Sequence, residues 1–241
     1  MSDPLLSVQG LRVEYDHAPA VHGASLVAAQ GEIVALVGAN GAGKTSTLRA
    51  IAGIVRAAAG TITVDGADIT QLRAHDVVAR GVAHVPEGRR LFGGMSVEEN
   101  VRLGAYREGD RAALDDRYAE MERLFPVIAA RRRQRASTLS GGEQQVVAIA
   151  RGLMSSPRIL LLDEPSLGVM PTVVSELYDL CRSLADKGVT IVIADQNLAR
   201  LLNLCDRGYV YSSGRILMTD TGANLLASDE VRQAFFGTMP S

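Results

Sequence analysis

The hydrophobic pattern of the chain predicts buried strands that alternate with amphipathic helices. Short apolar runs rich in β-branched residues stand at 32–37, 82–86, 158–162 and 189–194. Runs of this kind are typical of strands covered on both faces, as in a parallel sheet. Apolar residues at helical spacing follow at 46–52, 172–187 and 198–205. We therefore expect an α/β fold with a mostly parallel core sheet.

Three other stretches follow different patterns. The segments 5–15 and 24–27 read as strands of an antiparallel N-terminal part, and 60–66 reads as a further strand that ends in a turn. From 97 to about 154 the spacing is mostly helical and is interrupted at Pro126, and Ser96 with Glu99 fits a capping box before it. A hairpin at 209–218 and a short helix from about 222 end the pattern.

The stretch 38–45 fits the pattern of a phosphate-binding loop and stands between a predicted strand and a predicted helix. Glycine permits the tight turn that directs several backbone N–H groups at phosphate oxygens. Lysine supplies a point charge for the β- and γ-phosphates, and the threonine hydroxyl is placed to ligate Mg²⁺. The candidate ATP-binding residues here are Gly38, Ala39, Asn40, Gly41, Ala42, Gly43, Lys44, Thr45 and Ser46.

Two acids at the end of the strand at 158–162 supply the second half of a nucleotide site. Asp163 is placed to hold Mg²⁺ through water, and Glu164 to polarise an attacking water molecule. Upstream, Ser140 and two glycines precede a helical run, where free N–H groups could receive a phosphate. Taken alone, the same stretch also fits an ordinary helix N-cap.

Composition and charge exclude several classes of function. The formal net charge is −2 and aromatic residues make up 4%, so a nucleic-acid partner is not expected, and the basic run 131–135 is interpreted as solvated surface. Cys181 and Cys205 lie far apart, which argues against disulfides and structural zinc. No apolar run approaches the roughly 20 residues of a membrane span, so we expect contact with a membrane only through partners.

Taken in order, the phosphate loop, Leu139–Gln145, Leu160–Pro165 and Ser166–Gly168 resemble the ATPase subunits of ABC transporters over essentially the whole chain. The L-S-G-G-E-Q stretch is specific to that family. The resemblance implies a P-loop NTPase fold with an N-terminal antiparallel β subdomain and an inserted α-helical subdomain. It implies one domain over 1–241, with 1–94 and 156–241 forming the nucleotide-binding core and 95–155 the helical subdomain.

The same resemblance implies a site shared between two subunits. Two ATP molecules, with Mg²⁺, would lie between paired ATPase domains, each ATP on the phosphate loop of one subunit. The other subunit would cap the γ-phosphate with its signature residues Ser140, Gly141, Gly142 and Glu143. Tyr15 falls where the family places its adenine-stacking aromatic, although ordinary strand packing is its alternative role.

Three residues depart from the family pattern. Glu87 stands where the family usually has glutamine, and Gln196 where it usually has histidine, with Asp195 in place of glutamate before it. Gln196 can hydrogen-bond a γ-phosphate but cannot carry a positive charge. Glu87 can meet Mg²⁺ or the attacking water with an added negative charge. We therefore expect Glu164, Gln196 and Glu87 at the reaction centre, and Thr45, Asp163 and Glu87 near the metal.

These departures and the stretches around 85–100 and 195–197 resemble one branch, the ATPases of branched-chain amino-acid importers, and the shorter of their two ATPases. The implied partners are a second ATPase subunit, two membrane permease subunits and, indirectly, an extracytoplasmic solute-binding protein. The implied location is the cytoplasmic face of the membrane. Alternatives are an importer of urea or short amides, a soluble ABC ATPase of DNA repair or translation, and a P-loop kinase.

Overall fold

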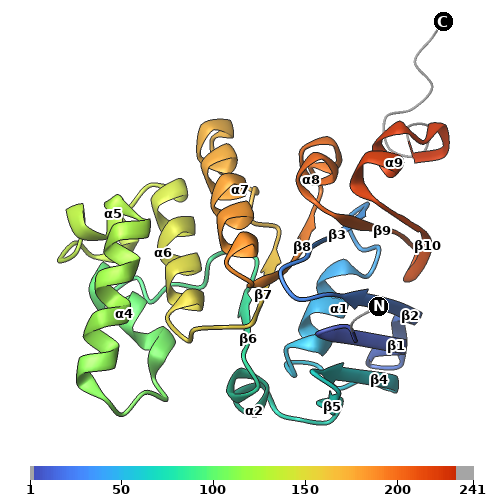
Figure 1. Cartoon of the computed structure of the whole chain (residues 1–241), viewed down its shortest axis with the longest axis horizontal. Coiled ribbons are helices and arrows are strands. Elements are labelled where there is room, and N and C mark those ends of the chain that lie inside the picture. The colour runs from blue at the N-terminus through green and yellow to red at the C-terminus, as the bar shows by residue number, and fades with distance from the viewer. Residues whose placement is uncertain (1–2, 232–241) are drawn as a thin grey trace, which may run out of the picture.

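The computed structural model describes residues 3–231, in which two β-sheets lie side by side (Figure 1). The larger sheet has six strands in the order β10-β9-β3-β8-β7-β6. All neighbours from β9 to β6 are parallel and only β10 is antiparallel, which confirms the mostly parallel core sheet. The strands are β3 (Ile33–Gly38), β6 (Val82–Val85), β7 (Ile159–Asp163), β8 (Thr190–Asp195), β9 (Arg207–Ser212) and β10 (Arg215–Asp220).

The smaller sheet is antiparallel and contains β2 (Ala18–Ala28), β1 (Leu6–Tyr15), β4 (Ala59–Val64) and β5 (Ala67–Asp68) in that order. This confirms the antiparallel N-terminal part. The predicted strand at 24–27 was too short, because Asp16 and His17 adopt positive φ values and fold the chain back at once. Pairing therefore begins at Tyr15 with Ala18.

Helices cover both faces of the larger sheet (Figure 1). Its buried residues alternate between two cores, with Ile33 and Ala35 facing one and Val34 and Leu36 facing the other. The helices are α1 (Lys44–Ile51), α2 (Ala74–Ala79), α3 (Val97–Arg102), α4 (Arg111–Leu124), α5 (Pro126–Ala130), α6 (Gly141–Leu153), α7 (Pro171–Asp186), α8 (Leu198–Leu204) and α9 (Gly222–Ala227), with 3₁₀ turns at Leu103–Ala105 and Ala136–Thr138.

The helices α4, α5 and α6 lie together on the side of the molecule away from the antiparallel sheet (Figure 1). The predicted capping box is present, since Ser96 accepts from the Glu99 N–H and Glu99 accepts from the Ser96 N–H. Pro126 separates α4 from α5, as predicted. The subdomain boundaries at 95 and 155 stay a prediction. Along the described residues, no helix combines the length and the hydropathy needed to cross a bilayer.

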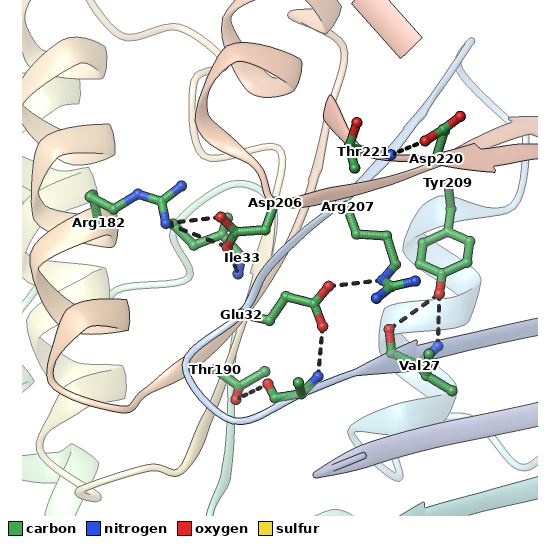
Figure 2. Close-up of polar contacts among 11 residues, drawn as sticks. Val27, Glu32, Ile33, Arg182, Thr190, Asp206, Arg207, Tyr209, Asp220 and Thr221 are labelled. Carbon is green, nitrogen blue, oxygen red and sulfur yellow. Dashed lines mark hydrogen bonds and ion pairs between the residues drawn. The ribbon is translucent and has the colours of Figure 1, made fainter. Parts of the chain in front are cut away.

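Polar contacts fix the start of β3 against its neighbours (Figure 2). The Tyr209 hydroxyl accepts from the Val27 N–H (2.9 Å) and donates to the Val27 carbonyl (3.2 Å), which joins the two sheets. Glu32 accepts from Arg207 at 2.8 Å, and Asp206 accepts from the Ile33 N–H at 2.8 Å. These contacts fix the orientation of β3, and therefore the position of the loop 38–45 that follows it.

Candidate functional site

The loop 38–45 leaves the carboxyl end of β3 and runs directly into α1. Gly41 and Gly43 have φ values of 75° and 107°, in the left-handed region that favours glycine. A Cβ at Gly38 would lie 2.5 Å from the Tyr211 carbonyl oxygen, so this position requires glycine for close packing. The N-cap of α1 has no side-chain hydrogen bond, which leaves its first N–H groups open to an anion.

Lys44 is buried within this loop and is only 4% exposed. Its Nζ donates to the carbonyl oxygens of Gly38 (2.8 Å) and Ala39 (3.2 Å). The same nitrogen lies 3.4 Å from Oε1 of Glu164. The loop thus holds an ammonium group in place beside the position that phosphate oxygens would take.

Asp163 ends β7 and faces the first turn of α1, where the Thr45 hydroxyl donates to its Oδ1 at 2.8 Å. Its Oδ2 is buried and has no hydrogen-bond partner among the described residues. Burial raises the pKa of Asp163, and the hydrogen bond from Thr45 opposes that shift. A carboxylate oxygen without a partner, next to a hydroxyl, is a ligand set that fits Mg²⁺.

Glu164 follows in a left-handed backbone conformation, with φ at 47°. Its N–H donates to the Ala194 carbonyl at 2.7 Å, which holds this unusual geometry at the tip of the sheet. Burial raises the pKa of Glu164, and the charge of Lys44 opposes that rise. A carboxylate whose pKa is raised toward neutrality is a better general base.

Asp195 is a structural support that the sequence did not reveal. Its carboxylate accepts from the Ser166 hydroxyl (2.7 Å), the Ser166 N–H (3.2 Å), the Tyr178 hydroxyl (3.4 Å) and the Asn197 N–H (3.0 Å). These bonds fix the loop after Glu164 and orient the turn that carries Gln196. An acid at the end of a buried strand, as Asp163 is at the end of β7, was the available signal.

The structure brings most of the predicted residues into one pocket of about 260 Å³. Its walls are the loop residues 40–46 together with Glu87, Glu164 and Gln196. Tyr15 lies outside this pocket, at the end of β1, and is 38% exposed. The signature residues Ser140, Gly141, Gly142 and Glu143 line a different, more apolar pocket between α6 and α7. Within one chain, the signature residues are therefore separate from the pocket formed by the loop 40–46 and the acid pair's Glu164.

The turn into α6 is a capping box in its own chain. The Ser140 side chain accepts from the Glu143 N–H, and Glu143 accepts from the Ser140 N–H at 2.8 Å. The hydrogen bond from the Ser140 backbone lowers the pKa of Glu143, which also pairs with Arg131. The N-cap interpretation that the sequence left open is thus confirmed, and Gly141 and Gly142 are half-buried in this turn.

The sequence profile described as ABC transporter matches residues 21–167. The chain is 42% identical to the high-affinity branched-chain amino acid transport ATP-binding protein BraG of Pseudomonas aeruginosa, over 97% of this chain and 100% of that protein. It is 35% identical to the lipopolysaccharide export system ATP-binding protein LptB of Escherichia coli K12, covering 96% and 97% of the two chains.

Among solved structures, the fold is similar to the ADP conformation of MJ1267, an ATP-binding cassette of an ABC transporter. The TM-score is 0.87 at 23% identity, with 98% of this chain and 100% of that chain covered. At this level of identity the likeness shows the fold, which is that of the P-loop NTPases.

Proposed function

The chain belongs to the ABC transporter family, as its ATPase subunit, and from that premise we propose that it powers an importer of branched-chain amino acids. The observation that carries this proposal is the 42% identity to BraG over the full length of that protein. The 35% identity to LptB makes lipopolysaccharide export the second candidate. An importer of urea or short amides is a further alternative, which is supported by the resemblance of the sequence motifs only.

ATP would bind on the loop 38–46, with Lys44 at the β- and γ-phosphates and Tyr15 against the adenine. Mg²⁺ would be held by Thr45, Asp163 and Glu87, and would neutralise charge on the phosphate oxygens. The Asp163 oxygen without a partner and the Thr45 hydroxyl bonded to Asp163 support this assignment.

Lys44 and Glu164 are the pair on which the proposed chemistry depends. In the structure, the Lys44 ammonium lies 3.4 Å from Oε1 of Glu164, at ion-pair distance. Phosphate oxygens would compete for the Lys44 ammonium and leave the Glu164 carboxylate free to accept a proton from water. Gln196 would then donate to the γ-phosphate through its amide, and Glu87 would contact the metal or the attacking water.

A second ATPase subunit would complete the site. Its Ser140, Gly141 and Gly142 would cap the γ-phosphate, while Glu143 shapes the same turn. The separation of these residues from the phosphate loop within one chain supports a site that two chains share. Loss of the γ-phosphate would then weaken the pair, because the charge that bridges it is gone.

Reconstitution tests the function. The chain would be combined in proteoliposomes with a candidate permease pair and solute-binding protein, and its rate of ATP hydrolysis would be measured. Leucine-loaded binding protein should raise that rate, while Lys44→Ala in the same assembly should abolish it. Stimulation by urea or acetamide instead would favour the short-amide alternative. Stimulation by lipopolysaccharide, with no response to leucine, would replace the importer with an exporter.

A further inference from the structure

The apolar pocket that the signature residues border lies between α6 and α7, two helices that stand side by side (Figure 1). Its volume is about 680 Å³. Apolar side chains line it at spacings of three and four along each helix, and they are Val146 and Ile149 on α6 and Val173, Leu177 and Leu180 on α7. A pocket of this size with mostly apolar walls is typical of a site for a small molecule.

Gln145 places an amide group in this wall. The residue is only 5% exposed, and its side chain forms no hydrogen bond with any residue that the structure describes. The preceding Gln144, by contrast, donates to the carbonyl oxygens of Ala136 and Leu139, both at 3.2 Å. Burying an amide without a partner is unfavourable, so a ligand that bonds to Gln145 would be stabilised by satisfying it.

The charged side chains that line the pocket are Glu143 and Glu176, and both are acids. Glu143 pairs with Arg131 at 3.3 Å. Glu176 is exposed on α7 and pairs with no cation in the described part of the chain. Arg89, which approaches the pocket at Gly168, donates to the carbonyl oxygen of that residue at 3.2 Å. The pocket therefore carries a negative charge without a counter-charge, which favours a cationic ligand.

Gln145 and Glu176 stand at matching positions on their helices. A Cβ at Gly142 would lie 3.4 Å from two methyl carbons of Val173, so the first turns of α6 and α7 are adjacent. Gln145 and Glu176 each follow these contact residues by three positions, about one helical turn. We propose that the pocket binds a small apolar amine, whose ammonium group donates to the Gln145 amide oxygen and neutralises Glu176. The site lies outside the phosphate pocket and requires no nucleotide.

Three naphthalene probes that differ in one group, a methyl, a hydroxymethyl or an aminomethyl group, test this site. Their fluorescence can be titrated with the full chain at neutral pH, because the chain contains no tryptophan. The wild type should bind the aminomethyl probe about two- to fivefold more tightly than the hydroxymethyl probe, an advantage limited by the exposure of Glu176. Glu176→Gln should remove this advantage, whereas Asp179→Asn, at an exposed position of α7 outside the pocket, should retain it.

Gln145→Leu separates the hydrogen bond from the charge. The variant keeps an apolar wall of similar size but offers no amide, so the two polar probes should lose about two- to tenfold in affinity relative to the methyl probe. The methyl probe should bind at least as tightly as it does to the wild type, which also shows that the variant is folded. Val146→Phe fills the pocket and should weaken the binding of all three probes.

Three results would overturn the proposal. Binding to Val146→Phe with wild-type affinity would place the probes elsewhere on the protein. A preference for the aminomethyl probe that persists in Glu176→Gln would remove that residue from the site. Self-association of the nucleotide-free chain that Val146→Phe abolishes would make a second copy of the chain the occupant of the pocket.

Discussion

The Thr45 hydroxyl donates to Oδ1 of Asp163 at 2.8 Å, although the two residues are 118 positions apart in the chain. The contact joins the phosphate loop to the tip of β7 and leaves Oδ2 of Asp163 without a partner among the described residues. Because the proposed metal would lie at these two side chains, Asp163 is the residue whose replacement tests it most directly.

Asp163→Asn should remove the contribution of Mg²⁺ to nucleotide binding. The amide keeps the acceptor for Thr45 but loses the charge that attracts the ion, so the Mg²⁺ concentration required should rise more than about tenfold. Thermal unfolding with ATP, across a Mg²⁺ titration, measures this. Asp186→Asn, at an exposed position on α7, is the matched control. An unchanged Mg²⁺ requirement would remove Asp163 from the metal site.

Glu164→Gln should bind ATP and hydrolyse it at least about 10²-fold more slowly, because the general base is lost while Lys44 keeps an oxygen partner. The bound ATP should then hold two subunits together, which sedimentation with and without ATP would detect. Glu120→Gln, exposed on α4, should hydrolyse ATP at the wild-type rate. Rapid turnover by the Glu164 variant would assign the base to another residue.

Lys44→Ala should weaken ATP binding by about 10- to 100-fold, since hydrogen bonds to a charged group contribute about 1.5–3 kcal/mol. Fluorescent ATP titration measures this. The chain contains one other lysine, Lys187, at the exposed end of α7, and Lys187→Ala is the matched control. Equal affinities for the two variants would count against the phosphate role of Lys44.

Tyr209→Phe should lower the free energy of unfolding by about 1–3 kcal/mol, because the Val27 N–H and carbonyl both lose their partner (Figure 2). Urea denaturation at 25 °C measures the change. Tyr106→Phe, at a side chain that is 60% exposed, should shift the midpoint little. Equal shifts for the two variants would show that the contact between the sheets adds no stability.

In His84→Gln, the free energy of unfolding should fall less steeply than in the wild type as the pH is lowered from about 6.5 to about 4. Burial, helped by the charge of Arg49, lowers the pKa of His84 from 6.5 to about 4. The unfolded chain therefore takes up a proton in this range before the folded chain does, so the stabilisation is present above pH 6.5 and disappears toward pH 4.

The expected size of the His84 effect is about 2–3 kcal/mol, from roughly 1.4 kcal/mol per pKa unit reduced for partial exposure. Urea denaturation midpoints of the wild type and the variant, measured across this pH range, give the contribution of His84. The raised pKa values of Asp163 and Glu164 affect both proteins equally and therefore cancel in the comparison. His17→Asn, on an exposed turn, should leave the wild-type slope. A parallel slope for His84→Gln would exclude this histidine as the cause.

Sequence alone was enough to predict which segments are helices and which are strands, and to locate the phosphate-binding loop and the acid pair. Apolar runs such as 33–38 and 159–163 specify buried strands through burial alone, and the glycines of the phosphate loop specify its turn through φ values that other residues avoid. Such signals are local, because they depend on neighbouring residues only. For the same reason, the sequence predicted Lys44 and Glu164 in two separate motifs at strand ends, and it did not predict the 3.4 Å contact between them.

Which polar groups from different elements come into contact could not be predicted from the sequence. Asp195 accepts hydrogen bonds from Ser166, Tyr178 and Asn197, and Arg89 donates to the carbonyl oxygen of Leu167. The hydrophobic periodicity of the sequence does not predict these contacts. The length of β2 likewise followed from the turn at Asp16 and His17 rather than from its hydrophobic pattern. The physical reason is that hydrogen-bond partners are selected by strand order and helix packing, which bring together residues that share no local pattern.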